Sequence, residues 1–247
     1  ADDDMLGHGV VNRLSHSKID TRYVRFAPSA GMGLWMVIND AAGRQAGAIS
    51  QMPDVKHIER IIDEHGDAIV READHIVLEI DLNEQISRRV LDLAWMYGKQ
   101  VYALPGNMEV LLRNVELLKK VSCFICNDIE AGRLFHTETA GKDPEDMQRL
   151  VRRGVKELEL PSMVITLGEK GCVFCDARKG APEDGWEPAI ATDVIDPSGA
   201  GDAFFSGTML ALTRGLPMRK AVKAGTQAAH RVLRSTESTV PAAKAVE

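Results

Sequence analysis

The sequence predicts an α/β fold built on a mainly parallel β-sheet. Short runs with the hydrophobic pattern of strands alternate along the chain with helical patterns of ten or more residues. This alternation favours parallel strands whose connecting helices cover both faces of the sheet. A chain of 247 residues, of which 45% are hydrophobic, is also long enough to bury a single large core.

The expected elements follow one another in a regular order. A helix ends near Ser15, and residues 33–38 and 46–50 form a hairpin across residues 39–44, where Gly43 supplies a permissive turn. Gly98 and Gly215 are placed to end the helices before them. Further helices are expected at residues 58–69, 86–97, 110–119, 144–158, 204–212 and 218–233. Strands are expected at residues 75–80, 100–104, 121–126 and 172–175. Two more strands are expected to end at Thr166 and at Val194 and Ile195.

The charge and hydropathy of the chain exclude several classes of partner. The net charge is -6, and no run of basic residues interrupts the sequence. A nucleic acid is therefore not expected as a partner. No apolar stretch approaches the roughly 18 residues that a membrane span requires, and no signal peptide is visible. The expectation is a cytoplasmic protein without a membrane partner.

The four cysteines form two C-x-x-C pairs, Cys123 with Cys126 and Cys172 with Cys175. The pairs are separated by more than the roughly 15–20 residues of common four-cysteine zinc sites. Both pairs lie in predicted strands, where side chains three positions apart point to opposite faces. The residues therefore favour buried, reduced thiols and no zinc, with a zinc site as the alternative.

Residues 196–204 read D-P-S-G-A-G-D-A-F and join a predicted strand end to a predicted helix. Gly199, Ala200 and Gly201 carry little or no side chain, so several backbone N–H groups can point into one small space. The helix N-terminus adds roughly half a positive charge there. Asp202 is placed to take a proton from an attacking hydroxyl. The segment predicts a phosphoryl-transfer site without a Walker lysine; an ordinary glycine loop, with Asp202 as a structural cap, is the alternative.

This segment resembles the signature D-T-x-G-A-G-D of the PfkB (ribokinase-like) family of sugar and nucleoside kinases, with Pro197 in place of the threonine. The resemblance implies a ribokinase-like three-layer α/β/α sandwich. It also implies that Asp202 is the catalytic base and that the backbone of Gly199, Ala200 and Gly201 forms an anion hole.

Two further motifs follow the same family pattern. Residues 127–130 (N-D-I-E) resemble its N-x-x-E element, and residues 166–171 (T-L-G-E-K-G) resemble its T-L-G-x-x-G turn. The resemblance implies that Glu130 holds Mg²⁺ and phosphates through water. It also implies that the nucleotide-binding residues, which contact ATP, are Asn127, Thr166, Gly168 and Gly171. Taken alone, the first motif is also an N-cap followed by a first-turn acid, and the second an ordinary strand and turn.

The acceptor side of the expected site is less well marked. Glu79 ends the strand at residues 75–80 and resembles the glutamate of the family's Q-L-E strand, which contacts sugar hydroxyls; a solvent-facing acid is the alternative. Residues 103–107 (A-L-P-G-N) depart from the family's N-P pattern. Residues 50–53 and 236–241 resemble segments of pseudouridine kinases, which favours a ribose- or pseudouridine-like acceptor. The resemblance also places a monovalent cation such as K⁺ near Asp196 and Ser238, and is compatible with a homodimer.

The opening residues resemble a family segment that normally follows the first strand and the substrate motif G-G-x-x-x-N, which this sequence lacks. The expectation is one PfkB-type domain over residues 1–247 without its N-terminal part, with a partial β lid at about 22–52. The expected activity is ATP-dependent phosphorylation of a hydroxymethyl group of a sugar or nucleoside. A nucleotide-binding, non-catalytic or truncated paralogue is the alternative. For the chain as given, nucleotide binding with near-background turnover is expected.

Overall fold

A computed structural model describes residues 1–28, 31–39, 45–81, 83–178, 180, 182–236 and 239. Its contacts divide the chain into two compact units, Ala1–Ile69 and Val70–Glu247. The single domain with a lid at about 22–52 stays a prediction, and each unit is described by itself.

The first unit combines one helix with one β-hairpin. Helix α1 (Met5–His16) begins after Asp4, whose Oδ1 accepts a hydrogen bond from the backbone N–H of Gly7 at 2.7 Å. Strands β1 (Leu34–Asn39) and β2 (Gln45–Gln51) pair antiparallel, which confirms the predicted hairpin. Its predicted turn, including Gly43, lies outside the described residues. Helix α2 (Lys56–Glu72) begins in this unit and ends in the second.

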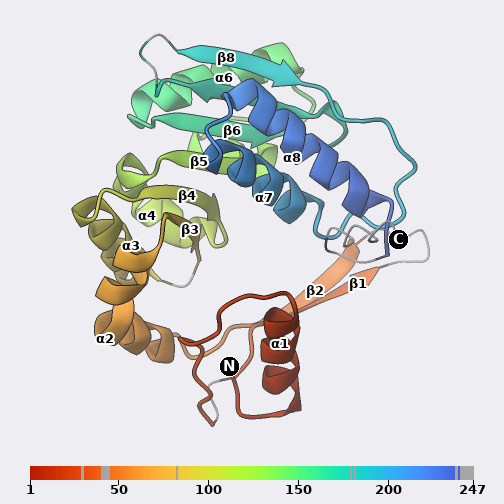
Figure 1. The fold of residues 1–247 in the computed structure, drawn as a ribbon. Coiled ribbons are helices and arrows are strands. Elements are labelled where there is room, and N and C mark those ends of the chain that lie inside the picture. Colours follow the sequence, from red (N-terminus) through yellow and green to blue (C-terminus); the bar gives the residue numbers. More distant parts are fainter. Residues whose placement is uncertain are drawn as a thin grey trace, which may run out of the picture. The chain divides into compact units, whose positions relative to one another are not determined.

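The second unit is built on a six-stranded sheet (Figure 1). Its strands are adjacent in sequence order; the first three connections are parallel, and the last two are antiparallel. This order confirms a mainly parallel sheet. The strands are β3 (His75–Ile80), β4 (Gln100–Pro105), β5 (Cys123–Asn127), β6 (Ser162–Thr166), β7 (Cys172–Asp176) and β8 (Glu183–Glu187).

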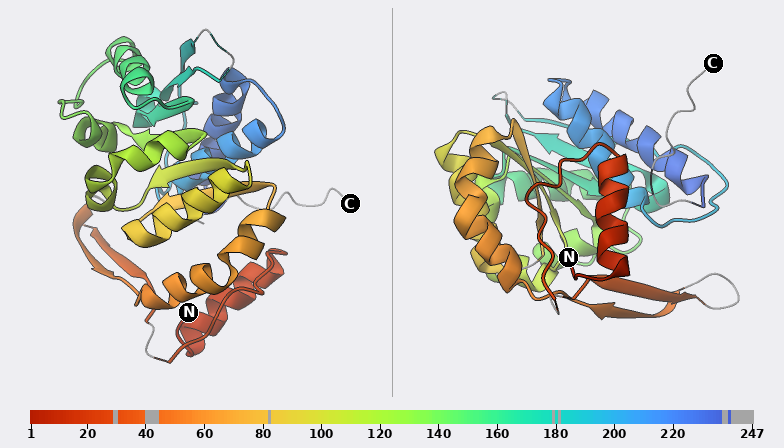
Figure 2. Two further views of the ribbon diagram at one scale, coloured as in Figure 1. Left: turned by 90° about the vertical axis from the view of Figure 1, so that its left-hand side faces the viewer. Right: turned by 60° about the horizontal axis from the view of Figure 1, so that its bottom comes forward.

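Helices cover both faces of this sheet (Figures 1 and 2). On one face, Ile125, Val164 and Phe174 are buried in a cluster with residues of α7 (Ala200–Thr213) and α8 (Met218–Leu233). The alternate strand residues, such as Phe124 and Ile165, are equally buried and therefore face the other side. Helices α3 (Glu84–Met96), α5 (Asp128–Leu134) and α6 (Pro144–Glu157) contact the strands there. The fold is the predicted α/β layering.

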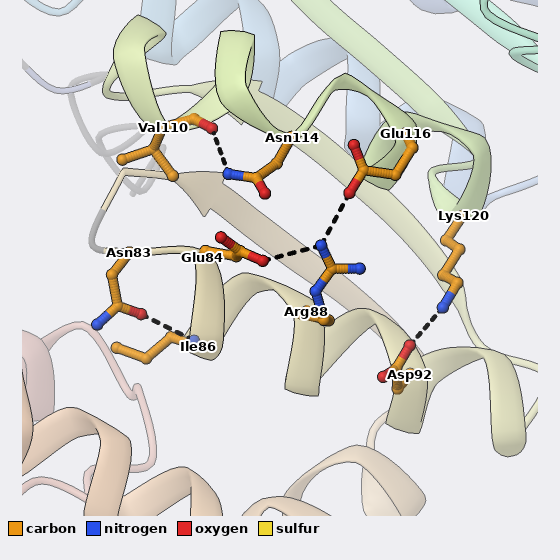
Figure 3. Close-up of polar contacts among 9 residues, drawn as sticks. All are labelled: Asn83, Glu84, Ile86, Arg88, Asp92, Val110, Asn114, Glu116 and Lys120. Atoms are coloured by element: carbon orange, nitrogen blue, oxygen red, sulfur yellow. Dashed lines mark hydrogen bonds and ion pairs between the residues drawn. The ribbon is translucent and has the colours of Figure 1, made fainter.

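Polar contacts tie α3 to the segment that follows β4 (Figure 3). Asn83 caps α3 by accepting from the backbone N–H of Ile86 at 2.9 Å. The guanidinium of Arg88 donates to Glu84 at 3.0 Å and to Glu116 at 2.8 Å, and Lys120 pairs with Asp92. Such surface pairs contribute at most about 1 kcal/mol each, so they orient the segment more than they stabilise it.

The prediction of one helix over residues 110–119 is wrong. Helix α4 (Met108–Arg113) ends at Asn114, and a 3₁₀ helix, η1 (Val115–Lys120), follows it. The buried Asn114 side chain donates to the carbonyl of Val110 at 2.9 Å, while its backbone N–H donates to Leu111. The side chain therefore takes the carbonyl that would continue the α-helix.

Two further segments of the second unit, residues 194–195 and strand β8, also differ from expectation. Val194 and Ile195 do not end a strand: both are exposed, and the N–H of Ile195 donates to the carbonyl of Leu233 at 2.8 Å. That carbonyl belongs to the last turn of α8, where no intrahelical donor is available. Strand β8, which the sequence did not predict, forms by antiparallel pairing with β7.

Within the part of the chain that the structure describes, no helix is both long enough and apolar enough to cross a membrane.

Candidate active site

The polar residues of the predicted site gather where the parallel strands end. Glu79 pairs in register with Leu104 near the end of β3 and β4, and Asn127 pairs with Thr166 at the end of β5 and β6. Because parallel strands share one carboxyl edge, these side chains lie along the same edge of the sheet. Open α/β sheets bind their ligands at this edge.

The glycine loop before α7 leaves two backbone donors free. Gly199, at φ 80°, is the N-cap residue of α7, and the N–H of Ala203 donates to its carbonyl at 2.9 Å. The N–H groups of Gly201 and Asp202 have no hydrogen-bond partner among the described residues. A Cβ added at Gly201 would meet no atom within 4 Å. Two unpaired donors beside open space at a helix N-terminus fit an anion.

Asp196 has a structural role in the same loop. Its Oδ1 accepts from the N–H of Ser198 at 2.8 Å, and this bond lowers the pKa of Asp196. Ser238, the other residue expected at a monovalent-cation site, lies outside the described residues. A K⁺ site here stays a prediction.

The turn between β6 and β7 depends on glycine. Gly168 has φ 59° and Gly171 has φ 91°, and the N–H of Leu167 donates to the carbonyl of Gly171 at 2.7 Å. A Cβ at Gly171 would lie 2.0 Å from the carbonyl oxygen of Glu187 and 2.6 Å from the backbone nitrogen of Ala189. Glycine thus lets the chain after β8 pass directly against the turn.

Both glycine segments face one cavity of about 650 Å³. This volume falls within the range of small-molecule sites, about 300–1,000 Å³. Five residues predicted from the sequence line it: Thr166, Gly168, Gly171, Ala200 and Gly201. The structure therefore brings the two motifs together, and their role in nucleotide binding stays a prediction.

Other lining residues were not predicted from the sequence. They come from the segment after β8 and from one face of α8, and include Ala189, Ile190, Ala191, Val194, Ala229 and His230. The helical spacing of the α8 residues was visible in the sequence, but a period shows only that residues share a face. Which face meets a cavity depends on the packing of α8.

The N-x-x-E motif forms a capping box at the start of α5. The N–H of Glu130 donates to Asn127 Oδ1 at 2.8 Å, and the N–H of Asn127 donates to Glu130 Oε2 at 2.8 Å. The alternative interpretation of this motif, an N-cap with a first-turn acid, therefore describes its local structure. Burial raises the pKa of Glu130, and the bond from Asn127 opposes that shift. A role for either residue with nucleotide or Mg²⁺ stays a prediction.

Glu79 lies close enough to Asp202 for its carboxyl group to respond to the Asp202 charge. Burial raises the pKa of Glu79, and the negative charges of Asp81 and Asp202 raise it further. A Cβ at Gly106 would lie 2.4 Å from the Cβ of Asp81 and 2.7 Å from Glu79 Oε1. Gly106, in the segment that departs from the family's N-P pattern, thus makes room for both carboxylates. Asp81 was not predicted from the sequence.

The cysteines are all buried within β5 and β7, which β6 separates. Burial raises the pKa of Cys123 to about 11 and that of Cys172 to about 12, so these thiols are protonated at neutral pH. Among the residues that the structure describes, no three His, Cys, Asp or Glu side chains are arranged to hold a metal ion.

Many nucleotide-binding enzymes use a mainly parallel α/β sheet with a glycine-rich turn at its carboxyl edge. The sequence matches the family model described as pfkB family carbohydrate kinase over residues 2–245. The chain therefore belongs to the pfkB family of carbohydrate kinases.

Several characterised proteins resemble the chain over most of its length. A guanosine-inosine kinase of Exiguobacterium acetylicum is 28% identical over 235 residues, which cover 95% of this chain and 76% of that protein. The pseudouridine kinase of Escherichia coli (strain K12) is 24% identical over 89% of this chain and 68% of its own length. The structure of Arabidopsis thaliana ribokinase, complexed with ribose and ATP, matches with a TM-score of 0.78 at 20% identity, covering 96% of this chain and 76% of that one. At that identity the likeness shows a shared fold.

Proposed function

We propose that the chain uses ATP to phosphorylate a hydroxymethyl group of a nucleoside or a ribose-like sugar. The observation that carries the proposal is the single cavity shared by the Gly168–Gly171 turn and the N-terminus of α7. The names of the relatives support a nucleoside, because a guanosine-inosine kinase and a pseudouridine kinase both align with most of this chain.

The phosphates of ATP would lie at the start of α7. The unpaired N–H groups of Gly201 and Asp202 can donate to phosphate oxygens, and the helix N-terminus favours their negative charge. Such preorganised donors stabilise charge that develops during the transfer of a phosphoryl group. The open space at Gly201 fits this role, since a side chain there would occupy the position of the phosphate.

Asp202 would act as the general base. Its carboxylate takes the proton of the acceptor hydroxyl as the hydroxyl oxygen forms a bond to the γ-phosphorus. The bond from that phosphorus to the oxygen of the β-phosphate breaks, and ADP leaves with the bonding electrons. Positioned bases contribute about 10²–10⁴-fold to rate.

Glu130 would hold Mg²⁺ through water, and the ion when bound would neutralise phosphate charge. The donor set fits this ion, because Mg²⁺ usually binds one or two carboxylates together with substrate phosphates. Glu130 uses Oε2 in the capping box, where it accepts from the backbone N–H of Asn127 at 2.8 Å.

Glu79 and Asp81 would accept hydrogen bonds from the hydroxyl groups of the acceptor. Both carboxylates lie beside Gly106, and the charges of Asp81 and of the proposed base, Asp202, both act on Glu79. Ionised carboxylates are acceptors only, which suits a diol. The same negative charge disfavours an acceptor that already carries a phosphate.

The test is release of ADP over a panel of guanosine, inosine, pseudouridine, cytidine and ribose, with Asp202→Asn as the variant. The substitution should lower kcat by about 10²–10⁴-fold, while the Kd of ADP changes by less than about threefold. Asp193→Asn removes a neighbouring exposed charge outside the cavity and is the matched control; its kcat should equal that of the wild type.

Two outcomes would contradict the proposal. Equal loss of turnover and ADP binding in Asp202→Asn would mark Asp202 as a structural residue. Tight ADP binding by the wild type without turnover of any acceptor would favour a nucleotide-binding protein without catalysis.

A further inference from the structure

The glycine turn between β6 and β7 contains one residue that does not face the cavity. Gly168, Glu169 and Gly171 line the cavity, whereas Lys170 does not. On one side the turn packs against the chain after β8, where Gly171 leaves no room for a side chain. How the turn is held on its other side depends on the contacts of Lys170.

Lys170 is hydrogen-bonded through both its backbone and its side chain. Its carbonyl accepts from the indole Nε1–H of Trp186, in β8, at 2.7 Å. Its ammonium donates to the carbonyl of Lys142 at 2.8 Å and, at 3.4 Å, to that of Gly141. A charged donor makes a stronger hydrogen bond than a neutral one. The turn is therefore tied both to β8 and to the loop before α6.

That loop is in turn fastened to the start of α5. The N–H of Lys142 donates to the carbonyl of Thr139 at 3.2 Å. Thr139 is buried, and its hydroxyl donates to the carbonyl of Asp128 at 2.9 Å. A Cβ at Gly132 would lie 2.7 Å from Thr139 Oγ1, so the loop packs directly on α5. Hydrogen bonds thus connect Lys170 to the first residue of α5.

The sheet alone does not hold the turn and α5 together. The pairing of β5 with β6 ends at Asn127 and Thr166, and both the capping box of α5 and the glycine turn lie at or beyond that last pair. Elements beyond the end of a ladder need other contacts to fix their relative position. The hydrogen bonds of Lys170 and Thr139 supply such contacts.

We propose that Lys170 is a positioning residue that holds the glycine turn against the start of α5; this inference rests on the proposed function. The nucleotide then meets the turn and the Asn127–Glu130 element in one fixed arrangement. Side chains that hold a site from outside reduce the ordering that a ligand must impose, and so strengthen its binding. Lys170 acts through the turn, since it does not line the cavity itself.

The test is calorimetric titration of the full chain with ADP, comparing wild type, Lys170→Met, Lys170→Arg and Lys99→Met. Lys170→Met keeps an unbranched apolar stem but removes the donor, and should weaken ADP binding about five- to tenfold. Lys170→Arg keeps a charged donor and should stay within about twofold of wild type. Failure of arginine to restore the affinity would overturn the proposal.

Lys99→Met is the matched control. The ammonium of Lys99 also donates to a backbone carbonyl, that of Arg71 at 2.9 Å, and Lys99 lies outside the cavity. The Kd of ADP should not change in this variant, and weakening as large as that of Lys170→Met would contradict a specific role for Lys170. Salt separates position from charge: at about 1 M salt, where charges are screened beyond roughly 3 Å, the effect of Lys170→Met should persist. An effect that disappears would assign it to attraction between the ammonium and the phosphates.

Hydrogen exchange tests the contact without a nucleotide. In Lys170→Met the amide of Lys142 should exchange about fivefold faster than in the wild type, because the loop has lost its tie to the turn. Lys170→Arg should exchange as the wild type does, and unchanged exchange in Lys170→Met would overturn the proposal.

The result also distinguishes this inference from the proposed function. Wild-type binding of ADP that Lys170→Met leaves unchanged would overturn the role of Lys170 alone. Failure of the wild type to bind ADP would contradict the proposed function, and the role of Lys170 in nucleotide binding with it.

Discussion

The two units differ in what holds them together and in what they carry. The buried hydrophobic side chains of the described chain fall between Val70 and Val232. In the described part of the first unit, burial is confined to Gly7 and Gly66. Its hairpin exposes large apolar side chains, such as Trp35 and Ile49. A two-stranded hairpin is at best marginally stable without packing.

The candidate site lies in the same unit as the hydrophobic core. All residues that line the cavity lie between Thr166 and Leu233, within the second unit. A preorganised site needs rigid support, which a packed sheet with helices on both faces provides. We therefore expect the stability of the chain and the proposed binding of nucleotide to depend on the same unit.

The largest expected effect on stability is that of Gly171→Ala. Its φ of 91° and ψ of -129° lie in a region that is essentially restricted to glycine, and the added Cβ would meet the backbone of Glu187. We expect a loss of about 3 kcal/mol or more in the free energy of unfolding. Gly47→Ala, in the hairpin of the first unit, meets no atom within 4 Å and is the control. Thermal unfolding measures both; equal losses would contradict the comparison.

A smaller effect is expected at the helix caps. Asn127→Ala removes the side chain that caps α5 and should cost about 1 kcal/mol. Glu130→Gln keeps a side chain that can complete the capping box and should be nearly neutral for stability. Asp4→Ala removes the equivalent cap of α1 in the first unit. It should leave the main unfolding transition unchanged; a shift as large as that of Asn127→Ala would show that the first unit unfolds with the core.

Much of this architecture could be predicted from local sequence signals. The hydrophobic pattern predicted β3 and α8 at the residues where they lie. Strand β8 could not be predicted, because its sequence, E-D-G-W-E, has no alternating pattern and its pairing with β7 is a tertiary contact. The break at Asn114 was hidden for a similar reason, since the apolar period continues across it.

The candidate site was predictable where glycines stand in recognisable sequence motifs. Gly171 and Gly201 each stand in a motif that the sequence displays, and the structure puts both on one cavity. His230 and Asp81 do not belong to a recognisable sequence motif. Their placement depends on which face of α8 packs inward and on the space left by Gly106.

The smallest expected effect concerns the charge of Glu79. Its raised pKa means that the folded protein holds the proton more tightly than the unfolded chain does. The ionised form therefore destabilises the fold above the folded pKa, and this penalty disappears as the pH falls below the usual value of about 4.3. Glu79→Gln should raise the Tm slightly at pH 7 and have no effect near pH 3.5. A lower Tm at pH 7 would show that ionised Glu79 stabilises the fold.

The most direct test of the central claim is the titration of Gly201→Val with ADP. A Cβ at Gly201 meets no protein atom within 4 Å, so the Tm without nucleotide should equal that of the wild type. The same side chain would fill the space assigned to phosphate, and ADP binding should weaken at least tenfold, about 1.4 kcal/mol. Unchanged ADP affinity in a fully folded Gly201→Val protein would contradict a nucleotide site at the start of α7.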